Sequence, residues 1–155
     1  MVTALLREGS SSPRWASFAA ALRERRNRLM RVLGDTPALI TAGTAPPRNY
    51  PANTYDYRAS SHFLYLAGLP LPGAALLLHD GYSRLYVPPP APDDALWHGT
   101  LPCDEDLRVA TGVDEVWPLA RLELNLDTVP EVGRLPAVPA EDRTPADERV
   151  IDAII

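Results

Sequence analysis

Apolar positions near the start of the chain recur at a near-helical spacing. Between residues 13 and 33 they fall at Trp15, Phe18, Ala19, Leu22, Leu29, Val32 and Leu33. This period predicts an amphipathic helix that packs one face on the rest of the protein. Ser12 and Pro13 supply an N-cap and a first-turn proline, and Gly34 supplies the end of the helix.

Arginines gather toward the end of this predicted helix, at Arg25, Arg26, Arg28 and Arg31. Cations are favourable at the negative end of a helix dipole. A phosphate site would be the alternative, but no glycine-rich loop accompanies the arginines. We therefore interpret the cluster as a solvated helix end.

Short apolar runs in the middle of the chain predict strands. The run ALIT (38–41) is partly β-branched and reads as a buried strand, and the proline-rich loop 42–54 follows it. HFLYLAG (62–68) is expected to be the next strand. The runs 74–80 and 83–89 flank Gly81 and Tyr82 and predict a hairpin. The first of these two is apolar throughout, which indicates burial on both faces.

The second half of the chain predicts short elements separated by prolines. Two short helices are expected between residues 93 and 112, then a strand at 114–119 and a helical stretch to residue 129. The segment 130–143 contains three prolines and reads as a linker. Strands that alternate with helices, together with one hairpin, predict an α/β fold with a mixed sheet and helices on its faces.

A last helix is expected from Thr144 and Pro145, which supply a cap and a first-turn proline. Its apolar face stops mid-pattern at Ile154 and Ile155. We expect this face to pack on residues outside the chain.

Composition is ordinary for a soluble globular protein, with 46% hydrophobic and 23% charged residues among 155. The net charge of −5 argues against nucleic acid or an anionic membrane as a partner. The apolar runs reach only about half of the ~20 residues that a membrane span requires. With no signal-peptide pattern and a single cysteine, Cys103, we expect a cytoplasmic protein without an intrachain disulfide.

All 15 basic residues are arginine, and there are 17 prolines. This bias is typical of GC-rich codon usage, so neither residue type is treated as functional for its number alone.

No catalytic centre is visible from spacing. The histidines His62, His79 and His98 are far apart in the chain. A metal could be held by the group His98, Cys103, Asp104 and Asp106, but no second cysteine or histidine pair supports it. An acidic first helical turn is the favoured interpretation. A nucleophile elbow and a phosphate-binding loop are also missing from the sequence.

The stretch 55–69, YDYRASSHFLYLAGL, carries a specific order of residues: Tyr55, Tyr57, Arg58, Ser61, Phe63, Tyr65, Leu66 and Gly68. It resembles the N-terminal domain of aminopeptidase P, of the creatinase/prolidase family. Three further stretches agree in order: 72–78, 83–99 and 112–119. The resemblance spans about residues 15–120. Two departures are His62, where the family usually has an acid, and Asp56, where it has proline.

The resemblance implies a domain with a ribonuclease H-like motif over residues 1–129, a linker at 130–143, and the first helix of a catalytic domain from residue 144. In the family, a pita-bread catalytic domain carries two divalent metal ions, usually manganese, and removes an N-terminal residue that precedes proline. Its five metal ligands are not found in this sequence. We therefore expect no catalysis from this chain alone, and a Xaa-Pro aminopeptidase as the parent protein.

Partners and site residues also follow from the resemblance. The family domain mediates dimers or tetramers, and its Trp-x-Gly loop can reach a neighbouring subunit's pocket. The matching residues here are Trp97, His98 and Gly99. Ordinary packing of the loop on its own domain is the alternative for Trp97. The family often has arginines next in this loop, whereas this sequence has Thr100 and Leu101.

The remaining family positions are expected to be structural: Tyr57, Arg58, Ser61, Phe63, Tyr65 and Gly68. For Arg58 we favour fastening of the proline-rich loop to the sheet over contact with a substrate, because the five donors of a guanidinium suit loop carbonyls.

Two other functions stay open. One is a stand-alone module that binds peptides or proteins without catalysis. The other is the N-terminal domain of a prolidase or creatinase, which share this domain type.

Overall fold

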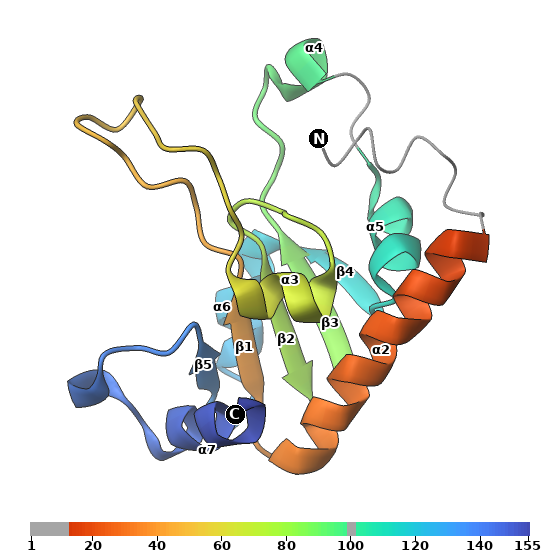
Figure 1. Ribbon diagram of the computed structural model, residues 1–155, viewed down its shortest axis with the longest axis vertical. Helices are drawn as coiled ribbons and strands as arrows, with labels where there is room; N and C mark the ends of the chain where they lie inside the picture. The colour runs from red at the N-terminus through yellow and green to blue at the C-terminus, as the bar shows by residue number, and fades with distance from the viewer. Residues whose placement is uncertain (1–12, 99–101) are drawn as a thin grey trace.

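A computed structural model describes residues 13–98 and 102–155, with the side chains of 97 and 98 left out. Its centre is a five-stranded sheet in the order β4-β3-β2-β1-β5, flanked by helices (Figure 1). This confirms the predicted mixed α/β fold. The strands are β1 (Ala38–Thr41), β2 (Ala75–His79), β3 (Tyr82–Val87), β4 (Glu115–Pro118) and β5 (Gly133–Leu135). The α-helices are α2 (Pro13–Leu33), α3 (Ser61–Ala67), α4 (Asp94–His98), α5 (Asp104–Thr111), α6 (Leu122–Leu126) and α7 (Pro145–Ile154).

Strand directions make the sheet mixed. β2 pairs antiparallel with both β1 and β3, and the outer strands β5 and β4 pair parallel with β1 and β3. The expected hairpin joins β2 to β3. Asp80 and Gly81 both have positive φ values, of 51° and 75°. A two-residue turn with this backbone matches the twist of paired strands.

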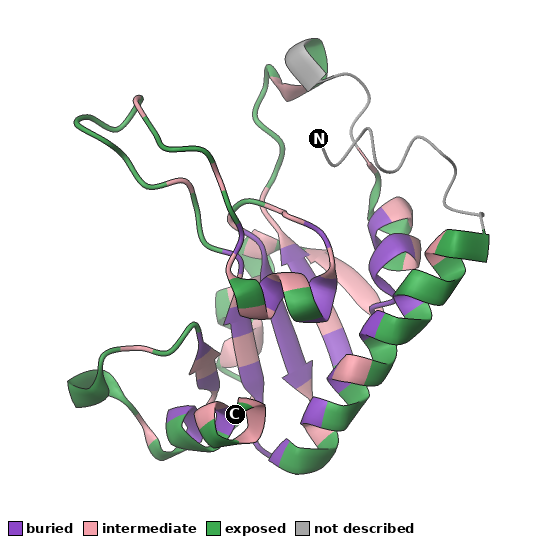
Figure 2. Cartoon of the chain, in the orientation of Figure 1, coloured by how far each residue is buried: buried purple, intermediate pink, exposed green. Residues whose placement is uncertain are grey.

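Helices cover the two faces of the sheet unequally (Figures 1 and 2). Helices α2, α3, α5 and α7 pack on one face around Ile40, Leu76, Leu78 and Leu85. The other face carries a smaller cluster under α6, which includes Leu77 and Tyr86. Alternate residues of β2 thus enter opposite cores, which confirms that this strand is buried on both faces.

The expected strand at 62–68 is wrong, because this segment forms helix α3. Ser60 caps its N-terminus by accepting a hydrogen bond from the Phe63 amide, and Gly68 ends it in the left-handed conformation with φ 79°. Phe63, Leu66 and Ala67 are its buried residues. Leu66 and Ala67 follow Phe63 by three and four positions, which puts the three on one helical face. In a short apolar run this period cannot be distinguished from that of a buried strand.

The segment 130–143, expected to be a linker, also contributes a strand. β5 lies within it and forms the sheet edge beside β1, with Ala38 opposite Gly133. A Cβ atom at Gly133 would collide with the Ala146 carbonyl oxygen and with Val150. Glycine therefore lets helix α7 approach the strand backbone closely.

Helix α7 packs on this chain's own sheet, contrary to the expectation that its apolar face is left for residues outside. Val150 is fully buried in the main core. The predicted cap is confirmed, since the Asp147 amide donates to the Thr144 hydroxyl and the Thr144 amide donates to the Asp147 carboxylate. The division into an N-terminal domain, a linker and the start of a second domain stays a prediction.

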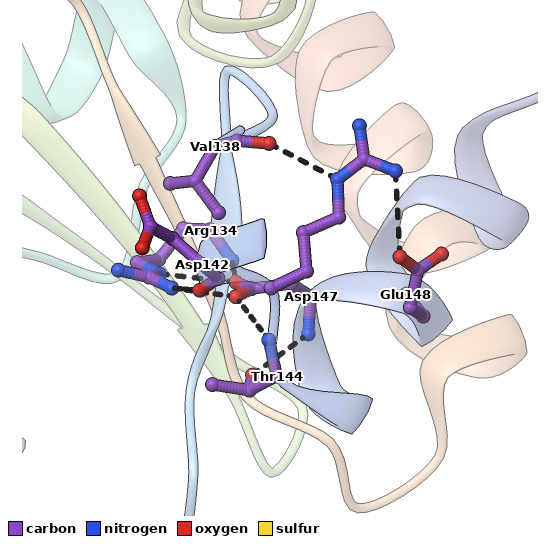
Figure 3. A network of polar contacts seen from close by, with 7 residues as sticks. Arg134, Val138, Asp142, Thr144, Asp147 and Glu148 are labelled. Carbon is purple, nitrogen blue, oxygen red and sulfur yellow. Dashed lines mark hydrogen bonds and ion pairs between the residues drawn. The ribbon is translucent and has the colours of Figure 1, made fainter. Parts of the chain in front are cut away.

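A buried carboxylate joins α7 to β5 (Figure 3). Asp147 is 0% exposed and accepts from the Arg134 backbone amide at 2.7 Å and from Arg134 Nη2 at 2.7 Å. Hydrogen bonding to the Arg134 guanidinium, and then to the Thr144 and Arg134 amides, holds the pKa of Asp147 well below its usual range.

The interpretation of the α2 arginines as a solvated cluster is wrong for one of them. Arg26 is 0% exposed. Its guanidinium donates to the carbonyl oxygens of Leu66 (2.8 Å), Thr111 (3.0 Å) and Gly112 (2.6 Å). These carbonyls lie at the C-terminal ends of α3 and α5, where helices leave acceptors unpaired. Arg26 therefore caps two helices at once and ties both to α2.

Candidate functional site

The two long connections of the fold leave the same end of the sheet. β1 and β3 are both antiparallel to β2, so they run parallel to each other. The chain therefore leaves both strands at the same end of the sheet. Residues 42–60 follow β1, and the segment that carries α4 follows β3; both project from that end in Figure 1. This loop end is the candidate functional site, because loops on a rigid scaffold are where binding residues concentrate.

The family-specific stretch begins in the first of these connections. The Ser60 amide donates to the Ala42 carbonyl at 2.9 Å, and its hydroxyl donates to the Thr41 carbonyl at 2.7 Å. The Tyr57 hydroxyl donates to the same Ala42 carbonyl at 3.5 Å, and burial raises the Tyr57 pKa. These bonds fasten the return of the loop to the end of β1.

Arg58 does not do the fastening. Its side chain is exposed, and among the described residues it makes no hydrogen bond or ion pair. Ser60 and Tyr57 fasten the loop instead, whereas the arginine that binds buried carbonyls is Arg26, at the ends of α3 and α5. Sequence reasoning missed Arg26, although a signal was present. The buried residues of α2 are Ala19, Leu22, Arg26, Leu29 and Leu33, so the arginine stands within the apolar stripe.

Three family positions serve the interior. Phe63 and Leu66 are buried in the main core. A Cβ atom at Gly68 would lie 2.6 Å from Leu22 Cδ1 and 2.8 Å from the Phe18 ring. Ser61 and Tyr65, by contrast, are exposed on α3. The structure therefore divides the stretch into residues that build the fold and residues that face outward.

The predicted residues of the second connection lie partly outside the description. Trp97 and His98 belong to helix α4, but their side chains are not described. Gly99 lies outside the described residues. Their roles as pocket or interface residues stay predictions.

The acidic turn near Cys103 is a helix start, as expected. The Cys103 amide donates to the Asp106 carboxylate at 2.9 Å, and Asp104, Glu105 and Asp106 lie in the first turn of α5. Over the described part of the chain, no group of three histidine, cysteine or acidic side chains could hold a metal ion. The two metal ions that the resemblance implies belong to the catalytic domain of the parent protein and stay a prediction.

A hollow of about 290 Å³ lies away from the loop end, beside the turn of the β2–β3 hairpin. It is lined by Leu77, His79, Asp80, Tyr82, Arg84, Asn125, Thr128 and Val129. Two of its polar side chains are engaged with neighbours, since Asn125 donates to the Tyr86 hydroxyl and Arg84 pairs with Glu115 at 2.8 Å. The Arg84 guanidinium also stacks on Trp117 at 4.4 Å.

Helices long and apolar enough to cross a bilayer are not found within residues 13–98 and 102–155.

Solved structures that are similar to this chain include aminopeptidases P. A protein from Bacillus anthracis described as an aminopeptidase P matches with TM-score 0.65 and 20% identity over 88% of this chain and 34% of its own. The Escherichia coli aminopeptidase P matches with TM-score 0.63 and 22% identity over 87% of this chain and 32% of its own. The aminopeptidase PepP of Pseudomonas aeruginosa matches with TM-score 0.60 and 23% identity over 85% of this chain and 32% of its own.

The chain thus spans about a third of the length of these structures. One form of the E. coli protein is zinc-substituted and in complex with product, and another contains the inhibitor Pro-Leu. A comparison with curated proteins found no significant match.

A family model described as "Aminopeptidase P, N-terminal domain" matches residues 22–132, more than half of the chain. The match covers the sheet from β1 to β4 and the whole family-specific stretch at the loop end. The chain belongs to the aminopeptidase P N-terminal domain family.

Proposed function

We propose that this chain is the non-catalytic N-terminal domain of a longer cytoplasmic Xaa-Pro aminopeptidase, a metallopeptidase of the creatinase family. In that protein it assembles dimers or tetramers and walls the substrate pocket. The family match over residues 22–132 carries the proposal. Two facts support it: the chain spans about a third of its solved relatives, and the described residues gather no metal-binding group.

The pocket-wall role rests on the geometry of the loop end. The connection that carries α4 projects from the same end of the sheet as the 42–60 loop (Figure 1). Trp97 lies in α4, and tryptophan is enriched among the residues that anchor interfaces. A loop in this position can reach a neighbouring subunit or a second domain without disturbing the core.

Hydrolysis distinguishes the domain from the longer enzyme. We expect no cleavage of a Xaa-Pro-Yaa tripeptide by the 155-residue chain, with or without Mn²⁺. The protein encoded by the full reading frame should cleave it when Mn²⁺ is present, because two metal ions would activate the attacking water and polarise the carbonyl. Liquid chromatography of the released residue measures both. A reading frame that ends soon after codon 155 contradicts the proposal, as does turnover by the short chain.

The same assay with a Xaa-Pro dipeptide separates the related activities. Cleavage of the dipeptide but not of the tripeptide favours a prolidase parent over an aminopeptidase.

Replacing Trp97 tests the assembly role. We expect Trp97→Ala to lower the molar mass of the full-length oligomer measured by light scattering, because a large aromatic anchor is lost from the interface. The matched control is Leu96→Ala, since Leu96 is the preceding residue of α4 and is 79% exposed. An oligomer unchanged by Trp97→Ala contradicts assembly through this residue. A monomeric protein that binds peptides without cleaving them favours the stand-alone binding module.

A further inference from the structure

Residues 46–55 form a hairpin, which we call the arm, that stands away from the body of the protein (Figures 1 and 2). The Arg48 amide donates to the Asn53 carbonyl at 2.7 Å. The Tyr55 amide donates to the Pro46 carbonyl at 2.9 Å. Within the described part of the chain, no residue of the arm belongs to either hydrophobic core. The arm is therefore an ordered element whose surface the fold leaves open.

The side chains of the arm are of the types that protein interfaces favour. Tyr50 and Tyr55 are 58% and 55% exposed, and the Arg48 guanidinium lies 4.7 Å from the centroid of the Tyr55 ring. Tyrosine and arginine are enriched where interfaces bury most area. Three of the ten residues are proline, which restricts the backbone before binding and lowers the entropy lost on association.

The arm lies at the end of the sheet opposite to the C-terminal helix. It follows β1, whereas α7 stands beside the start of that strand, where Arg149 Nη1 donates to the Thr36 hydroxyl at 3.2 Å. Figure 1 shows the same separation, with the C-terminus low and the arm high. A segment that follows Ile155 would start at the far end of the sheet from the arm, whereas a second copy of the chain can approach the arm directly.

Charge also favours a second copy as the partner. The arm carries one charged residue, Arg48, whereas the chain has a net charge of −5. Two acidic copies repel each other over most of their surface and least where charged side chains are few. A strongly charged partner, by contrast, would find a single charge to pair with, which contributes little at an exposed site.

We propose that the arm binds the arm of a second copy of this chain about a two-fold axis. Tyr50 and Tyr55 of each copy pack on the arm of the other. A two-fold contact uses the same surface on both copies and closes on itself, so it gives a dimer and not a filament. The inference rests on the assembly role in the proposed function and adds to it the surface and the partner.

Amide hydrogen exchange of the 155-residue chain between about 10 μM and about 1 mM tests the contact. A two-stranded hairpin alone is marginally stable in water, so the Arg48 and Tyr55 amides that close the arm should exchange readily in a monomer. We expect both amides to exchange about fourfold more slowly at the higher concentration, the mass-action result for a dissociation constant of about 0.1 mM.

Two tyrosine variants locate the contact. Tyr50→Ser should abolish the concentration dependence and keep the exchange rates of the dilute wild type, which shows that the arm still forms. The matched control is Tyr82→Ser, because Tyr82 is also an exposed tyrosine, 46% exposed, and stands at the start of β3, at the other end of the sheet. This control should keep the wild-type concentration dependence.

Exchange of the arm amides that does not change with concentration overturns the contact, as do equal effects of Tyr50→Ser and Tyr82→Ser. Light scattering of the protein from the full reading frame separates this failure from that of the proposed function. An oligomer lost in Trp97→Ala but kept in Tyr50→Ser overturns the arm and leaves the assembly role, whereas a monomeric wild type overturns both. Arm amides protected at every concentration, and only in the longer protein, would assign the arm to a second domain instead.

Discussion

Replacing Arg26 with methionine should destabilise the protein by about 2–4 kcal/mol, because the buried carbonyl oxygens of Leu66 and Thr111 lose their side-chain donor, whereas Arg23 still donates to Gly112. Methionine fills a similar volume, so the loss reports hydrogen bonding more than a cavity. Urea unfolding followed by circular dichroism gives the free energy of unfolding.

The buried Arg26 charge also carries a desolvation cost in the folded protein. Burial, and then the nearby charge of Arg23, lowers the pKa of Arg26 to about 10, so the folded protein disfavours this charge. Its removal relieves that cost. We still expect a net loss, because the carbonyls of Leu66 and Thr111 remain buried while their partner is gone.

Two further variants sharpen the result. Arg26→Lys keeps the charge but cannot span acceptors on two helices, so it should recover only part of the stability. Arg28→Met is the matched control, since Arg28 is an exposed arginine of the same helix that pairs with Glu24, and it should change stability by less than about 0.5 kcal/mol. An Arg26→Met protein as stable as the wild type would show that α2 is held by apolar packing alone.

Replacing Asp147 with asparagine should cost about 2 kcal/mol at pH 7 and remove a pH dependence of stability. The folded pKa of Asp147 lies below the value of about 3.9 for an unfolded aspartate. Its contribution is therefore fully present above about pH 5 and is lost as the pH falls through the folded pKa. The wild type should begin to lose its advantage over Asp147→Asn as the pH falls below about 4.

The measurement is urea unfolding of both proteins at several pH values from 3 to 7. Glu148→Gln is the control, since Glu148 is the next residue of α7 and pairs with Arg143 at the surface at 3.3 Å. That variant should follow the wild-type pH dependence closely. A difference between wild type and Asp147→Asn that stays constant with pH would show that the carboxylate charge does not hold α7 to β5.

Local chemistry was enough to predict several elements. Helix α2 has a long apolar period, the β2–β3 hairpin has turn residues between two apolar runs, and α7 has a threonine–proline start. Each signal lies within a few residues of the element that it specifies. The family was predictable for a related reason, because the stretch at 55–68 carries an ordered set of residues that needs no structure to be recognised.

Other features depend on residues far away in the chain. Strand β5 has only three residues and becomes a strand because the edge of β1, more than ninety positions earlier, supplies its partner. Arg26 is buried because carbonyls 40, 85 and 86 positions away converge on it. A stretch of sequence around β5 or around Arg26 does not contain these distant partners. The segment 62–68 was predicted to be a strand, and the caps at Ser60 and Gly68 together with the burial of one face make it helix α3 instead.

The candidate site shows the same division. The sequence by itself determined which residues mark the family and placed Trp97 in a loop that merits testing. Only the tertiary structure decided that Phe63 and Gly68 serve the core while Arg58, Ser61 and Tyr65 are exposed, with Arg25 stacked on the Tyr65 ring. The physical reason is that exposure depends on which elements cover a residue, and α2 and the sheet come to α3 from distant parts of the chain.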